Sequence, residues 1–173
     1  MRQTSFAAFH CSLARSLEVV GDWWSPLILR DLFLGLDRFE ELVQDLGISR
    51  NLLADRLETL VAGGVVERTP YQDRPVRHRY ALTEAGRDLV PVLLALTAWG
   101  DRWAVPEGGP PLRVRHDRCG TVAVPAVACG HCGEPLTADD VTALPGPGGR
   151  AAPGTALLPA ALAPALRERH LPG

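Results

Sequence analysis

Hydrophobic residues recur every three or four positions along the first part of the chain, and this period predicts amphipathic helices. Four such segments come first: residues 12–20, about 22–33, 39–46 and 49–62. Asp22 is the expected cap of the second helix, Gly47 is a typical stop for the third, and Ser49 is a favoured N-cap for the fourth. A short Gly-Ile-Ser turn therefore joins the third and fourth helices and holds them at a fixed angle.

The period then changes from helical to alternating. Residues 65–69 and 77–82 read as two short strands joined by a turn at 72–75, which together predict a β-hairpin. Arg77 and Arg79 lie on one face of the second strand, so that face is expected to be the solvated one.

A long fifth helix is predicted from a Thr83 cap to about Trp103. Pro91 must kink or break it, because an interior proline costs a helix about 3 kcal/mol. Its apolar positions form two adjacent stripes, which is more hydrophobic surface than packing on one small domain requires.

Three helices followed by a two-stranded hairpin are the elements of a winged helix. We therefore expect a mainly α fold with a small β wing. The predicted organisation is a winged helix-turn-helix domain for DNA binding and dimerisation at 11–104, a small zinc-ribbon-like module at 112–143, and a flexible Pro/Gly/Ala-rich tail at 144–173.

The start of the fourth helix is the part of the domain predicted to contact DNA bases. A major groove about 12 Å wide admits one helix, and the wing would then contact the backbone or the minor groove. The candidate DNA-binding residues are Ser49, Arg50, Asn51, Ala54, Asp55 and Arg56 in the helix and Arg74, Arg77 and Arg79 in the wing. The segment 49–79 holds six Arg against four acidic residues, whereas the whole chain has a net charge of −2. Any affinity for phosphate must therefore be local.

The composition of the chain indicates a folded protein and bears on its location. The chain has 173 residues, of which 46% are hydrophobic, enough for a folded core. It shows neither a run of about 18 apolar residues nor a signal-peptide pattern, so we expect a cytoplasmic location and no membrane partner.

Two similar turns in the C-terminal region have the form ligand-x-x-Cys-Gly. Their candidate metal ligands are His116, Cys119, Cys129 and Cys132. This spacing lets two side chains of one turn reach the same ion, so we expect a structural zinc with four protein ligands. His131 is an alternative ligand within the second turn.

Two other readings of these cysteines stay open. They could be reduced thiols in a loop, or Cys119 could form a reversible disulfide with one of the later pair. The tetrapeptide from Cys129 to Cys132 also matches the active site of thiol-disulfide oxidoreductases. That chemistry needs a thioredoxin-like sheet, which the remaining residues are too few to supply, so no enzyme activity is expected.

Several motifs resemble the HxlR family of bacterial winged-helix regulators, which is related to the MarR regulators. They are Trp24 with "LILRDL", "RFEEL" at 38–42, "LADRLETL" and "YALTEAGR". The resemblance covers Cys11 to about Trp103. It implies transcription regulation by a homodimer, joined through the first and last helices of the domain, on a pseudo-palindromic double-stranded DNA operator.

The resemblance also bears on effectors and on specificity. Cys11 matches a cysteine that some family members use to sense oxidants, so an oxidant or small-molecule effector is implied, although a small packed side chain near a dimer seam is an equal alternative. Ser12 departs from the proline that often follows this cysteine in the family. Asn51 and Asp55 depart from the Lys and Gln that are frequent there, and Asp55 leaves the operator sequence open. A winged helix that binds protein instead of DNA is the rival interpretation.

Overall fold

The structure is a computed structural model that describes residues 5–162, and these fall into two compact units. One unit comprises residues 23–135, and the other combines residues 5–22 with residues 136–162. None of the helices within residues 5–162 is both long enough and apolar enough to cross a bilayer.

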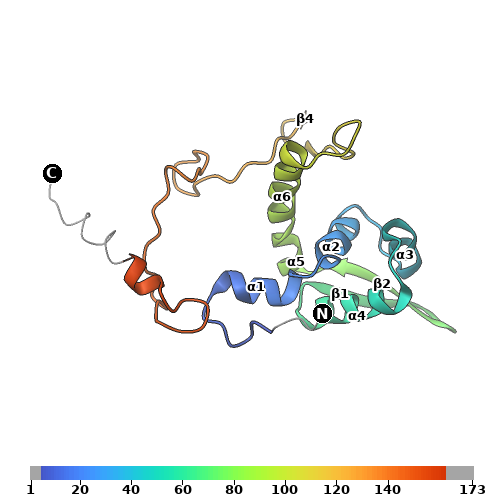
Figure 1. Ribbon diagram of the computed structural model, residues 1–173. Coiled ribbons are helices and arrows are strands. Elements are labelled where there is room, and N and C mark those ends of the chain that lie inside the picture. Colours follow the sequence, from blue (N-terminus) through green and yellow to red (C-terminus); the bar gives the residue numbers. More distant parts are fainter. Residues whose placement is uncertain (1–4, 163–173) are drawn as a thin grey trace. The chain divides into compact units, whose positions relative to one another are not determined.

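The larger unit contains most of the helices and the β wing (Figure 1). Its elements in chain order are α2 (Ser25–Phe33), α3 (Phe39–Leu46), α4 (Arg50–Ala62), β1 (Val66–Asp73), β2 (Val76–Leu82), α5 (Glu84–Asp88), α6 (Val90–Trp103), β3 (Arg115–His116) and β4 (Thr121–Val122). β1 pairs antiparallel with β2, and β3 pairs antiparallel with β4. This mostly helical chain with a small antiparallel hairpin is consistent with a winged helix-turn-helix fold.

The core of this unit lies where α2, α3 and α4 meet the base of the β1–β2 hairpin. Its buried hydrophobic side chains are Ile28, Leu29, Leu32, Leu42, Ile48, Leu53, Leu57, Leu60, Val65, Val66 and Leu82. Burial of each large one is worth about 1.5–3 kcal/mol, so this cluster holds the helix pair in place. The Arg30 side chain adds a polar tie between α2 and α3, because it donates a hydrogen bond to Asp45 at 3.1 Å.

The start of α2 differs from the prediction. The helix begins at Ser25 and its N-cap is Trp24, so the expected cap at Asp22 is wrong. Pro26 occupies the first turn, and proline at that position favours the start of a helix just before it.

The wing is longer than the sequence indicated. The first strand was predicted at residues 65–69, yet β1 continues to Asp73 and pairs Pro70 with His78. A two-stranded ribbon has only edge strands, and an edge strand tolerates a residue that lacks an N–H group. The register shifts between Pro70 and Gln72, which places Tyr71 in a bulge.

The predicted long helix is broken into two pieces. α5 ends at Asp88, Leu89 forms the boundary, and α6 then carries Pro91 in its first turn, as the proline rule requires. The Thr83 cap is confirmed, because its hydroxyl accepts a hydrogen bond from the N–H of Gly86 at 3.2 Å. Only glycine fits at position 86 without a steric clash, because a Cβ there would lie 2.0 Å from the carbonyl oxygen of Val65.

The smaller unit contains α1 (Ser12–Val20), which has the predicted bounds. Residues from the predicted tail pack beside the segment that precedes α1. The backbone N–H of His10 donates to the carbonyl of Pro153 at 2.9 Å, and His10 Nε2 lies 2.5 Å from the carbonyl oxygen of Gly148. Residues 158–162 are helical, and the last part of the predicted tail, 163–173, lies outside the described residues.

Candidate nucleic-acid interface

The turn between α3 and α4 has the geometry of a helix-turn-helix. Gly47 adopts φ 61° and its N–H bonds to the carbonyl of Val43, which ends α3 in a left-handed residue. Ile48 is buried and anchors the turn in the core. The hydroxyl of Ser49 then accepts a hydrogen bond from the N–H of Leu52 at 3.4 Å and caps α4 as predicted.

α4 separates its buried and exposed positions cleanly. Leu53, Leu57 and Leu60 face the core. Of the candidate DNA-binding residues in and before this helix, Ser49, Arg50, Asn51 and Asp55 are exposed, whereas Ala54 and Arg56 are half-buried. The exposed polar start of α4 is therefore free to approach a ligand end-on, while Arg56 is partly withdrawn from the surface.

Arg50 is held by α3. Its guanidinium donates two hydrogen bonds to the carboxylate of Glu40, at 2.5 and 2.7 Å, and lies 5.1 Å from the centre of the Phe39 ring. The hydrogen-bonded Arg50 lowers the pKa of Glu40, and Glu40 in turn raises the pKa of Arg50. The sequence reading did not include Glu40 or Phe39 among the site residues.

The arginines of the wing differ in their contacts. Arg74 at the tip and Arg77 beside it are exposed. Arg79 donates to the carboxylate of Asp37 at 3.2 Å, and its guanidinium lies 5.6 Å from the centre of the Tyr71 ring. The backbone carbonyl of Asp37 also accepts a hydrogen bond from the N–H of Tyr80, so Asp37 fixes the wing to the segment before α3.

Arg38 and Tyr71 are further members of this surface that the sequence reading missed. The Arg38 guanidinium lies 5.5 Å from the centre of the Tyr71 ring, which is thus approached by two arginines. The sequence alone gave no signal for this pair, because an arginine before a helix and a tyrosine in a hairpin are both common. Arg38 and Tyr71 come together only because α3 packs beside the wing.

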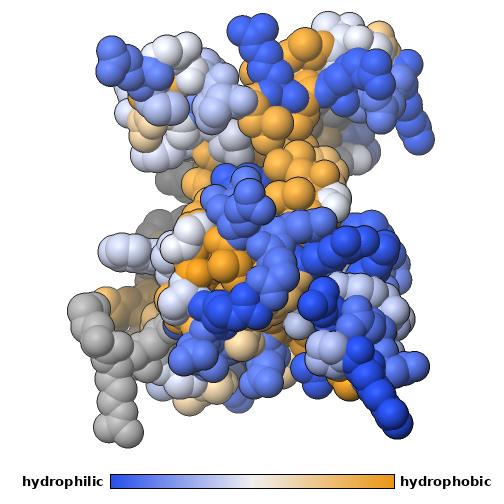
Figure 2. All heavy atoms as spheres, turned by 90° about the vertical axis from the view of Figure 1, so that its right-hand side faces the viewer, coloured by the Kyte–Doolittle hydropathy of each residue, from blue (hydrophilic) through white to orange (hydrophobic). Residues whose placement is uncertain are grey.

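A groove of about 560 Å³ runs between α3, the start of α4 and the wing. Its lining includes Arg38, Phe39, Glu40, Arg50, Tyr71 and Arg77. We call these six residues and the space between them the α3–wing groove. Figure 2 looks onto this side of the unit and shows blue hydrophilic side chains gathered over its lower part, where α3 and the wing lie. The groove can accept a ligand that brings negative charge to Arg77 and Arg38.

The four candidate metal ligands lie in two turns. His116 Nδ1 is 3.4 Å from Cys119 Sγ, so these two side chains face one another. Cys129 and Cys132 likewise form a hydrogen-bonded pair within the second turn. Among the described residues, no three His, Cys, Asp or Glu side chains gather around one point. The structure thus brings the ligands together as two pairs.

Backbone N–H groups donate hydrogen bonds to two of the thiols. The N–H of Thr121, assisted by the His116 ring, lowers the pKa of Cys119 to about 7. The N–H groups of Cys132 and His131 lower the pKa of Cys129. Neither thiol lies at a helix N-terminus, since Cys119 and Cys129 both belong to turns within the 104–157 stretch that contains no helix.

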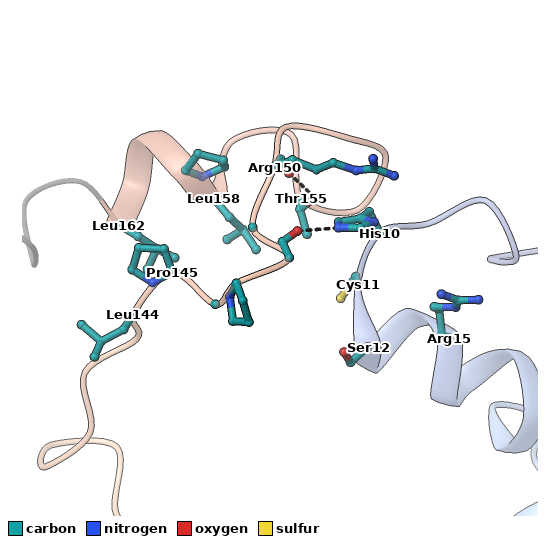
Figure 3. A pocket seen from close by; sticks show the side chains of 15 residues that line it. His10, Cys11, Ser12, Arg15, Leu144, Pro145, Arg150, Thr155, Leu158 and Leu162 are labelled. Atoms are coloured by element: carbon teal, nitrogen blue, oxygen red, sulfur yellow. Dashed lines mark hydrogen bonds between the residues drawn. The ribbon is translucent and has the colours of Figure 1, made fainter.

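Cys11 lines a cavity of about 550 Å³ in the smaller unit. It stands at the N-cap of α1, and in Figure 3 its thiol points toward the space enclosed by Leu144, Pro145 and Leu158. His10 and Arg15 are also among the residues that line this cavity. The sequence singled out Cys11, but the cavity itself needs residues that follow it by more than a hundred positions.

Comparison with known proteins places these features in a family. A model described as HxlR-like helix-turn-helix matches residues 19–107. The HTH-type transcriptional regulator Rv3095 of Mycobacterium tuberculosis, named as uncharacterised, is 49% identical over 140 residues, which cover 81% of this chain and 89% of that protein. A match of this length necessarily spans residues 116–132, so the similarity extends beyond the helix-turn-helix region.

Solved structures agree with this assignment. The candidate transcription factor PA1607 is 38% identical, with a TM-score of 0.70 over 81% of this chain and 98% of its own. The candidate transcription factor PA1374 of Pseudomonas aeruginosa is 37% identical, with a TM-score of 0.57 over 86% of this chain and 99% of its own. This chain belongs to the HxlR-like helix-turn-helix family.

Proposed function

We propose that the chain is a sequence-specific, DNA-binding transcriptional regulator that acts as a homodimer. The observation that carries this proposal is the pairing of an exposed polar helix start, at Ser49 to Asn51, with an arginine-bearing wing on the same side of one compact unit. α4 would enter the major groove, where side chains at its N-terminus meet base edges, and the wing would reach the backbone or the minor groove.

The two parts of this surface have different tasks. Arg50 and Asn51 are on the helix that enters the groove, so they would read bases. Arg74 and Arg77 are exposed on the wing and would neutralise phosphates, which positions the protein without selecting a sequence. Arg79 is already paired with Asp37 and would orient the wing.

A second copy of the chain is the proposed partner of α6. Val92, Leu96, Trp99 and Trp103 are each 58–65% exposed, and their spacing of four, three and four residues puts them on one helical stripe. This stripe has the seam pattern of a coiled coil. Orange side chains at the level of α6 are visible in Figure 2. Two-fold pairing through such a stripe would place two α4 helices on a pseudo-palindromic operator.

The cavity at Cys11 supports a proposal for the effector. Its volume lies in the range of small-molecule sites, and its lining combines apolar side chains with a thiol and the polar His10 and Arg15. An oxidant or an electrophile that modifies Cys11 would change the packing of the segment before α1. A regulator of chromosomal DNA acts where that DNA lies, so the cytoplasm remains the expected compartment.

The experiment that tests the DNA-binding proposal is selection of bound fragments from random double-stranded DNA by the purified full chain. Enrichment of a sequence with two-fold symmetry is expected. Binding to the selected site should weaken steeply as salt rises, because phosphate contacts release counterions. Failure to enrich any DNA, together with a salt-insensitive protein partner at the α3–wing groove, would favour the rival interpretation of a protein-interaction module.

A further inference from the structure

The two cysteine-bearing turns share a closing hydrogen bond and a left-handed glycine. In the first, Gly120 has φ 71° and donates its N–H to the carbonyl of His116 at 2.8 Å. In the second, Gly133 has φ 78° and donates its N–H to the carbonyl of Cys129, also at 2.8 Å. Each turn therefore closes on its first candidate ligand through a left-handed glycine that follows its second candidate ligand.

The residues around the turns correspond as well. Arg115, just before the first turn, pairs with Val122, and Ala128, just before the second, pairs with Pro135 in the same antiparallel sense. The separation along the chain is the same in both pairs. Two closed loops of identical length thus present their ligands, first and fourth in each loop, from equivalent backbone positions.

The backbone also prepares the sulfurs to bind a cation. The N–H of Thr121 points at the sulfur of Cys119, and the N–H groups of His131 and Cys132 point at the sulfur of Cys129. Such N–H groups orient thiolate ligands and spread their charge in metal sites. The His131 side chain is not needed for this arrangement, because its contribution comes from the backbone.

We propose that His116, Cys119, Cys129 and Cys132 bind one zinc ion that joins the two turns. Each turn is a preformed half-site, and the ion draws the two together in a tetrahedral set of three thiolates and one imidazole. Each thiol gives up its proton to solvent on binding. Four protein ligands leave no position for water, so the ion is structural and not catalytic.

The chain between the turns can accommodate this closure. Residues 123–127 contain no helix or strand, and each residue can extend the chain by up to about 3.3–3.6 Å, so the second turn can reach the first. Val124 and Val127 in this connection are exposed, as are Val122 and Leu136. A segment with so little buried apolar surface needs another source of stability, and a metal centre is the usual one in small modules.

The first test measures metal in the full chain purified under reducing conditions. One zinc per chain is expected, and replacement by Co²⁺ should give the absorption of a tetrahedral site with thiolate-to-metal charge transfer from three sulfurs. Absence of stoichiometric metal from a protein that also fails to bind added Zn²⁺ would overturn the proposal. A cobalt spectrum with only two sulfur ligands would do so too.

Variants assign the ligands. Cys119→Ser, Cys129→Ser and Cys132→Ser should each lose the metal, and His116→Ala should weaken its retention against a chelator by at least tenfold. His131→Ala, in the same turn as two ligands, and Cys11→Ser, in the other unit, are matched controls that should keep it. Loss of metal in His131→Ala with retention in His116→Ala would refute the ligand set.

A ligand variant could lose the metal because it unfolds, so a further test measures thiol reactivity in a chain that keeps all four proposed ligands. In the Cys11→Ser chain, a thiol reagent should find no reactive cysteine before chelation and three after it. Thiols that react at once in the metal-loaded protein, or a disulfide in their place, would contradict the site. This inference does not depend on DNA binding, so each can fail without the other.

Discussion

The guanidinium of Arg50, at the start of α4, forms a two-bond ion pair with the carboxylate of Glu40 on α3, with donor–acceptor distances of 2.5 and 2.7 Å. Both side chains are exposed, so the pair is screened by water and adds little to stability. In the proposed complex it would matter for recognition, because it neutralises an arginine proposed to contact a base and would set a negative charge beside the DNA.

Glu40→Gln should therefore tighten binding to DNA. The change releases Arg50 and removes a carboxylate that repels phosphate, so affinity for all sequences should rise and the dependence on salt should steepen. Fluorescence anisotropy at several salt concentrations measures both effects. Glu107→Gln makes the same change in net charge in the segment after α6 and should leave affinity nearly unchanged. Equal gains in the two variants would show that net charge alone is responsible.

Arg50→Ala and Asn51→Ala should alter sequence preference. If these side chains contact bases, each substitution should cost on the order of 1–3 kcal/mol on the selected operator and less on unrelated DNA. Arg74→Ala and Arg77→Ala should weaken binding to every sequence alike. Competition between operator and random DNA measures the ratio, and the same loss of specific and non-specific affinity at all four positions would refute this division.

Leu96→Glu should give monomers. Leu96 is 58% exposed on the stripe proposed as the dimer seam, so a glutamate there would leave an unpaired charge in the interface. Both Leu93 and Leu96 line a cavity between α2 and α6, but Leu93 is half-buried, so its substitution would damage the fold more than that of the exposed Leu96. Sedimentation velocity reports the outcome. A dimer that survives Leu96→Glu at micromolar concentration would exclude this seam.

Gly86→Ala should destabilise the winged unit. The added methyl would lie 2.0 Å from the carbonyl oxygen of Val65, so α5 must move away from the hairpin, and overpacking of this kind costs about 1–3 kcal/mol or more. Gly100→Ala is the matched control. Among the described residues, no atom beyond the local helix backbone lies within 4 Å of the new methyl there, and alanine favours a helix over glycine by about 0.5–1 kcal/mol. The midpoint temperature of thermal unfolding should therefore fall for Gly86→Ala and rise for Gly100→Ala.

Local patterns were enough to predict the helix-turn-helix. α1, α3 and α4 begin and end where the apolar period and the residues Gly47 and Ser49 predicted. Such signals act within one turn of backbone, because a cap bonds to N–H groups only two or three residues away. The ligand-x-x-Cys-Gly turns were visible in the sequence for the same reason. The Asp22 cap failed because a proline nearby, Pro26, set the helix start more strongly.

Tertiary structure decided which predicted side chains are available. Glu40 lies ten positions before Arg50, and Asp37 lies forty-two positions before Arg79, so neither ion pair follows from local pattern. The sequence likewise showed that the last helix is apolar on two faces, but only packing determined that Leu93 is half-buried while Leu96 stays exposed. Helix caps and the apolar period depend on residues that are close together in the sequence. The partner of a charged side chain or of an apolar face depends instead on which distant segments the fold brings beside it.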